Sequence, residues 1–168
     1  MKPLKFPLPK YRKAFYAFII PFLLRAIIEI YSAPYTVGYD TVAEYVPTIG
    51  GFTSIFNYVI FEISSLYNGI AMSLQFVLQN PILTVKVLAI LLVGFLGLTL
   101  YLWGTTFLSR KNALFFSLIA SFYFSTLRIT WDLHRNLLGL SLMFATIYVI
   151  ESIHNNKLRL PFLFSWPF

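Results

Sequence analysis

The sequence predicts an all-α integral membrane protein with about four transmembrane helices and further amphipathic helices at the membrane interface. Of its 168 residues, 58% are hydrophobic and only 11% are charged, whereas soluble domains carry about 25% charged residues. Several apolar stretches approach the ~20 residues that a helix needs to cross a bilayer. The net charge is +7. Most of the basic residues lie beside those apolar stretches, as residues that determine membrane topology do, so the charge does not indicate a nucleic-acid partner.

The chain begins with a basic segment, residues 1–13, which we expect to be a cytoplasmic tail near anionic lipid headgroups. The apolar run 14–30 is the first predicted span, with a kink at Pro21. This run is too long for the apolar part of a signal peptide and has no small-residue cleavage site. The predicted location is therefore the cell membrane, with several spans and a cytoplasmic N-terminus.

Two charges lie inside the first span. Arg25 and Glu29 are four residues apart, so a helix places them on one face. Charges inside a membrane are costly unless they are paired or face a polar cavity. One interpretation is a mutual salt bridge that lets the helix insert. The other makes Arg25 part of a binding site for an anionic substrate.

Residues 31–81 form the first predicted outer loop, because this region carries acidic residues and no Lys, Arg or His. Within it, residues 52–79 have polar and apolar positions on opposite faces of a helix. Such a helix lies in the membrane interface, with its polar face toward water. We expect Gly69 to divide it into two pieces.

The clearest span is 82–103, and Asn80 and Pro81 before it are typical of a helix N-cap and first helical residue. Lys86 is the one charge within this span, and we expect it to reach outward to the membrane interface. Gly94 and Gly97 are predicted to leave a flat patch for close helix packing.

The rest of the chain predicts a helical hairpin, 113–130 and 134–150, followed by a cytoplasmic end, 151–168. If 52–79 crossed the membrane, the basic residues Arg110 and Lys111 would lie outside. The arrangement with 52–79 at the interface keeps them inside, in agreement with the positive-inside rule.

Two polar clusters could carry chemistry. Asp40 and Glu44 are four residues apart, and they belong either to a solvated turn or to a functional loop. Arg128, Asp132 and Arg135 share a face if their segment is helical, and two cations around one acid suit a phosphate ligand. Anchoring at the interface is the alternative for this second cluster.

No cofactor is predicted, and a divalent metal is compatible with the sequence but not indicated by it. Asp132 and His134 would point apart on a helix, and a metal site needs at least three convergent ligands. The chain has no cysteine, which excludes disulfides, and no phosphate loop or nucleotide fingerprint.

The order of these elements resembles that of a known family. A basic N-terminus and one span, followed by Pro-Tyr-Thr-Val-Gly-Tyr-Asp-Thr at residues 34–41, resemble the polytopic glycosyltransferases of the C superfamily, above all archaeal and protein-mannosyltransferase-like members. Asn-Pro-Ile-Leu-Thr-Val-Lys at 80–86 and the cluster at 128–136 also resemble that family. The resemblance implies that Asp40 is the catalytic aspartate and that the sugar donor is a polyprenyl-phosphate sugar.

The expected function follows from this resemblance. Family members are several times longer, so we expect the N-terminal part of such a transferase, truncated or encoded as one subunit of a split gene. Asp40 would act in catalysis with support from Glu44, and Arg128 and Arg135 would hold the donor phosphate. Asp132 and Arg25 are also predicted to belong to the substrate-binding site. The expected partners are membrane lipid, the lipid-phosphate sugar donor and another membrane subunit, with no nucleic acid.

The alternative function is a small non-catalytic membrane protein that packs as a subunit against larger partners. In that case, Gly94, Gly97 and the pair formed by Arg25 and Glu29 would be contacts with a partner.

Overall fold

The computed structural model describes residues 11–35, 37–38, 41, 45–50, 66–123 and 134–154. The regular structure within these ranges is helical throughout, which confirms the all-α class. Its helices are α1 (Arg12–Tyr31), α2 (Val46–Gly50), α4 (Leu66–Leu78), α5 (Pro81–Phe107), α6 (Arg110–Phe122) and α8 (His134–His154). Most of the predicted tail 1–13 and of the predicted end 151–168 lies outside the described residues.

Three of the described helices, α1, α5 and α8, are long and apolar enough to cross a membrane. We predicted four spans. The predicted span 113–130 corresponds to α6, which has 13 residues and is shorter than the ~20 that a crossing needs. Residues 124–130 of that span lie outside the described residues, and the described part of the chain has three helices long and apolar enough to cross a membrane.

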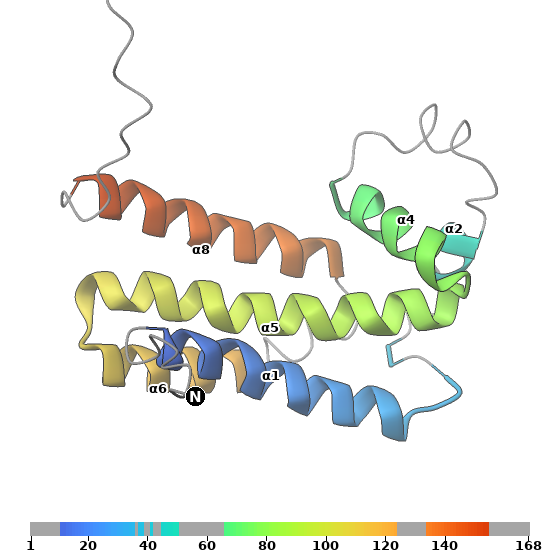
Figure 1. The fold of residues 1–168 in the computed structure, drawn as a ribbon, viewed down its shortest axis with the longest axis horizontal. Helices are drawn as coiled ribbons and strands as arrows, with labels where there is room; N and C mark the ends of the chain where they lie inside the picture. The colour runs from blue at the N-terminus through green and yellow to red at the C-terminus, as the bar shows by residue number, and fades with distance from the viewer. Residues whose placement is uncertain are drawn as a thin grey trace, which may run out of the picture.

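Helix α5 is the centre of the bundle (Figure 1). Helices α1 and α6 pack along one side of it, α8 packs along the other, and α2 and α4 cover its N-terminal end. Successive long helices are antiparallel, so the start of α1, the start of α6 and the end of α8 lie toward the same end of the bundle. The basic residues Arg12, Lys13, Arg110 and Lys111 therefore gather at one end, as the charge pattern predicts.

The start of α5 is fixed by local chemistry. The side-chain oxygen of Asn80 accepts a hydrogen bond of 3.0 Å from the backbone N–H of Leu83, and Pro81 is the first helical residue. Proline suits this position because the first helical N–H has no partner within the helix. The predicted cap is confirmed, and α5 extends beyond the predicted span to Phe107.

The predicted flat patch on α5 is also confirmed. A Cβ atom on Gly97 would lie only 2.2 Å from the carbonyl oxygen of Ala17, and one on Gly94 would lie 2.9 Å from the ring of Phe18. Both neighbours belong to α1, so the two glycines let α1 and α5 approach closely. The alternative assignment of these glycines to a separate partner protein is wrong, because their contact surface is filled by this chain.

Replacement of Gly97 by alanine is expected to destabilise the protein by about 1–3 kcal/mol, because the new methyl group collides with backbone rather than with a movable side chain. Gly139 in α8 is the matched control. A Cβ there meets nothing within 4 Å, so Gly139→Ala should be neutral or stabilise by up to ~1 kcal/mol through helix propensity. Unfolding free energies in detergent provide the measurement, and equal values for the two variants would contradict the close packing.

Helix α4 corrects two predictions. It runs through Gly69 without a break, so this residue does not divide it.

The predicted water-facing polar side of α4 is turned inward: Asn68 is buried, and the Gln75 side chain accepts a 2.7 Å hydrogen bond from Thr84 of α5. Polar groups inside a bundle are stabilised by such pairing. Phe76 and Val77 point outward instead and are 77% and 75% exposed, as suits a lipid-facing surface. Residues 51–65 of the predicted amphipathic region lie outside the described ranges.

Candidate functional site at the N-terminal end of helix α5

The predicted site residues divide into two groups. Asp40, Glu44, Arg128 and Asp132 lie outside the described residues. Arg25 and Arg135 are described, as are Thr41 and Tyr45, which flank the two predicted acidic residues in the sequence. The described neighbours thus show where the ends of the acidic loop and of the second polar cluster lie.

Four side chains from three segments meet above the N-terminal half of α5, and we call them the Tyr45–His134 cluster: Tyr45, Tyr67, His134 and Arg135. The rings of Tyr45 and His134 are stacked, with centroids 5.0 Å apart and planes at 7°. The Tyr67 hydroxyl lies 3.3 Å from Nδ1 of His134. The guanidinium carbon of Arg135 lies 5.6 Å from the centroid of the Tyr45 ring, within cation–π range.

Three members of the cluster are buried, and Arg135 is exposed. His134 is completely buried, and Tyr45 and Tyr67 are 4% and 3% exposed. Both tyrosines pack in the same core as Val85 and Leu88 of α5. Aromatic pairs of this kind add about 0.5–1.5 kcal/mol each beyond the area they bury. The segment before α2, helix α4 and the first turn of α8 are therefore held together at one place.

Sequence reasoning missed the central member of this cluster. The sequence indicates His134 only as a weak candidate for a metal ligand beside Asp132, whereas its ring lies against Tyr45 and Tyr67. A signal was present in the tyrosine-rich stretch 31–45 and in the single histidine at the edge of an apolar run. Nothing in the sequence shows that these two features meet, because 89 positions separate Tyr45 from His134 (134 − 45 = 89).

A second group lies between α1 and α5, and we call it the buried charge cluster: Arg25, Glu29, Ser32 and Lys86. Arg25 donates from Nη2 to Oε1 of Glu29 at 2.5 Å, and both residues are 3% exposed. The predicted salt bridge is confirmed. The ammonium of Lys86 donates to the backbone carbonyl of Glu29 at 2.7 Å and to Oγ of Ser32 at 3.3 Å. It lies 3.9 Å from the Glu29 carboxylate.

The position of Lys86 corrects the prediction that it reaches outward to the membrane interface. Lys86 is only 9% exposed and points at the C-terminal end of α1. The Lys86 side chain reaches from α5 to the last turn of α1. The last carbonyl groups of a helix have no hydrogen-bond partner within that helix. A cation near a helix C-terminus is favoured by the helix dipole, which gives a physical reason for the inward orientation.

The Tyr45–His134 cluster and the buried charge cluster both lie beside the turn of α5 that contains Val85 and Lys86. Thr84 hydrogen-bonds to Gln75 of α4, Val85 packs in the core with Tyr45, and Lys86 bonds to Glu29. The loop that follows α1 is therefore fixed at both ends. Its first part is fixed where Lys86 meets Ser32, and its last part is fixed where Tyr45 stacks on His134.

The buried charge cluster also bears on the two interpretations of Arg25. Its bond to Glu29 confirms the salt-bridge interpretation, and the interpretation of Arg25 as part of an anionic-substrate site stays a prediction. Within the described ranges, no three His, Asp or Glu side chains come together as a metal site would require. Chemically, the described arrangement places an exposed cation, Arg135, against the ring of the buried Tyr45, which itself stacks on His134.

Comparison of the chain with protein-family models, with curated proteins and with solved structures finds no match.

Proposed function

We propose that this chain is the N-terminal part of a membrane glycosyltransferase that uses a polyprenyl-phosphate sugar. One observation supports this most: Tyr45, the residue that follows Glu44 in the sequence, stacks on His134 in the first turn of α8 and lies beside Arg135. Catalytic groups are commonly placed on loops that a rigid scaffold positions. The family resemblance described above supplies the reaction class.

The proposed roles follow from charge and position. Asp40 acts as the base that activates the acceptor hydroxyl, and Glu44 supports it. Arg135 binds the donor phosphate together with Arg128, because a guanidinium matches phosphate oxygens in a two-pronged fork.

The proposed membrane arrangement places this end of the bundle outside the cell, opposite the basic ends of α1 and α6. Helix α4 then lies at the outer membrane surface. Its exposed Phe76 and Val77 meet the lipid there, and Asn68 and Gln75 face the protein.

A transfer assay tests the proposal. Membranes that contain the chain, with any genomically linked membrane partner co-expressed, are incubated with a radiolabelled polyprenyl-phosphate sugar. We expect Arg135→Gln to raise the KM for the donor roughly 10- to 150-fold, because a hydrogen bond to a charged group contributes ~1.5–3 kcal/mol. Arg110→Gln removes an exposed arginine at the other end of the bundle and should leave the KM unchanged.

Two results would count against the proposal. If the two arginine variants behave alike, the donor phosphate does not bind at the first turn of α8. If the unmodified chain transfers no sugar with its partners present, the non-catalytic subunit becomes the better account. In that account Gly94 and Gly97 are not partner contacts, since both lie against α1 of this chain.

A further inference from the structure

Helix α8 starts farther along the bundle than α5, and α4 lies beside the part of α5 that α8 does not reach (Figure 1). The ring of Phe144 in α8 stacks on that of Trp103 in α5, with centroids 4.8 Å apart, so these two residues share a level. Pro81 starts α5 22 residues before Trp103, and His134 starts α8 10 residues before Phe144. At 1.5 Å per residue, the start of α8 is therefore roughly 18 Å below the start of α5.

The end of α1 marks the outer boundary of the hydrocarbon core. Helix α1 has 20 residues, a length of about 30 Å, which equals the thickness of that core. Tyr31 and Tyr35 at this end are 88% and 75% exposed, and tyrosines are enriched at the headgroup level. Lys86, five residues after Pro81, bonds to the Glu29 carbonyl in the last turn of α1. The start of α8 thus lies roughly 10 Å inside the core.

Helix α4 connects these two levels. Near its C-terminal end, Gln75 accepts the hydrogen bond from Thr84 in the first turn of α5. Near its N-terminal end, the Tyr67 hydroxyl lies 3.3 Å from Nδ1 of His134, the first residue of α8. Figure 1 shows that α4 runs obliquely from the start of α5 toward the start of α8. The N-terminal half of α4 is therefore at the level of the hydrocarbon core.

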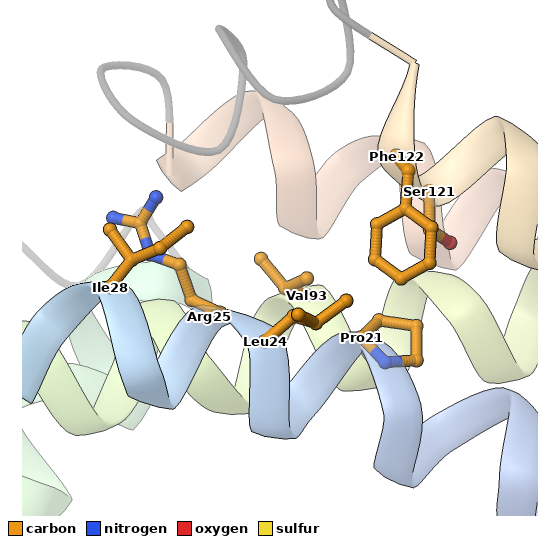
Figure 2. A pocket seen from close by; sticks show the side chains of 7 residues that line it. All are labelled: Pro21, Leu24, Arg25, Ile28, Val93, Ser121 and Phe122. Atoms are coloured by element: carbon orange, nitrogen blue, oxygen red, sulfur yellow. The ribbon is translucent and has the colours of Figure 1, made fainter.

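Helix α6 shows that a half-depth helix fits this bundle. It starts at the basic end and has the same length as α4, 13 residues or about 20 Å. Its last residue, Phe122, lines a pocket together with Pro21, and Figure 2 shows both side chains at the same end of that pocket. Because Pro21 lies at the middle of α1, α6 reaches only the middle of the bundle. Helix α4 is its counterpart in the outer half.

The exposed face of α4 suits hydrocarbon rather than water. The helix contains no charged residue, whereas a helix that lies on the membrane surface carries a strongly polar or charged face toward water. Leu66 is exposed and Ile70 is partly exposed on the N-terminal half. The exposed Ser73 hydroxyl donates a 2.8 Å hydrogen bond to the Gly69 carbonyl of the same helix. Such a bond satisfies the hydroxyl where lipid offers no partner.

We propose that α4 enters the outer leaflet obliquely and that its N-terminal half, residues 66–73, contacts the acyl chains of that leaflet. The C-terminal end of α4, with Phe76 and Val77, stays at the membrane surface. The contact of Tyr67 with His134 then lies inside the membrane. This inference rests on the proposed membrane arrangement but not on sugar transfer, so the transfer assay and the test below fail independently.

The test measures the depth of α4 in a bilayer. The chain contains no cysteine, so single cysteines can carry a nitroxide label. The labelled full chain is reconstituted into phosphatidylcholine vesicles. EPR power saturation then gives the ratio of collisions with oxygen, which concentrates in hydrocarbon, to collisions with a water-soluble nickel chelate.

Leu66→Cys, Ser73→Cys and Val77→Cys sample α4, and cysteines at the exposed Leu23 and Ile30 of α1 calibrate depth inside the core and at its boundary. We expect the ratio to rise in the order Val77, Ser73, Leu66. Val77 should match Ile30, and Leu66 should match Leu23.

Three results would overturn the inference. Equal ratios at the three α4 positions would show a helix that lies flat at the surface. A ratio at Leu66 as low as that at Gln79, an exposed residue between α4 and α5, would place Leu66 in water. Few collisions with either reagent at Leu66 and Ser73 would show that protein, such as another subunit, covers this face. If Leu66→Cys fails to fold, Ile70→Cys lies one turn along the same face and should still give a higher ratio than Val77→Cys.

Discussion

The change Glu29→Leu is expected to destabilise the protein by about 3–5 kcal/mol, because it removes the carboxylate that faces the buried cations Arg25 and Lys86. The double change of Arg25 and Glu29 to leucine should be milder. Replacement of a buried ion pair by hydrophobic residues is often neutral or stabilising, whereas removal of one partner leaves a buried charge.

Unfolding free energies of the three proteins in the same detergent decide this prediction. Glu151→Leu in α8 is the control, since it removes an acid that is only partly buried and should change stability by about 0.5 kcal/mol or less. If Glu29→Leu is as stable as the double variant, the carboxylate does not hold the cluster together.

The change Asp40→Asn is expected to reduce sugar transfer by about 10²–10⁴-fold, the usual contribution of a general base. Asparagine keeps the size of the side chain but cannot take a proton. The unfolding free energy should stay nearly constant, because the substitution leaves the contacts of Ser32 with Lys86 and of Tyr45 with His134 in place.

Transfer is measured in membranes with a radiolabelled polyprenyl-phosphate sugar, and Glu44→Gln is tested in parallel. A smaller loss is expected for Glu44→Gln, because Glu44 is assigned a supporting role. Full transfer by Asp40→Asn would remove Asp40 from the mechanism and make Glu44 the next candidate for the base.

The features that the sequence predicts correctly depend on neighbours along the chain. The cap of Asn80 on α5 and the pair of Arg25 with Glu29 follow from three- and four-residue spacings within one helix. Close packing at Gly94 and Gly97 follows from the absence of side chains. These effects require no knowledge of which helix lies beside which.

The features that the sequence predicts wrongly depend on tertiary contacts. The inward turn of Lys86 requires the end of α1 beside it, and the inward polar face of α4 requires Thr84. The role of His134 requires Tyr45 from a distant loop. Periodicity alone identifies the two faces of α4 but cannot say which one meets protein and which one meets lipid, because both environments are apolar.

The central claim is that the acidic loop and the first turn of α8 form one site through the stack of Tyr45 on His134, and NMR of the histidine rings tests it directly. The chain has two histidines, and His154 is exposed. With histidine labelled by ¹³C and ¹⁵N and His154→Gln used for assignment, the ring protons of His134 should lie upfield of those of His154, because they face the Tyr45 ring. In Tyr45→Leu they should move toward the His154 position. Coincident signals of the two histidines in the unmodified chain, or no movement in Tyr45→Leu, would contradict the account.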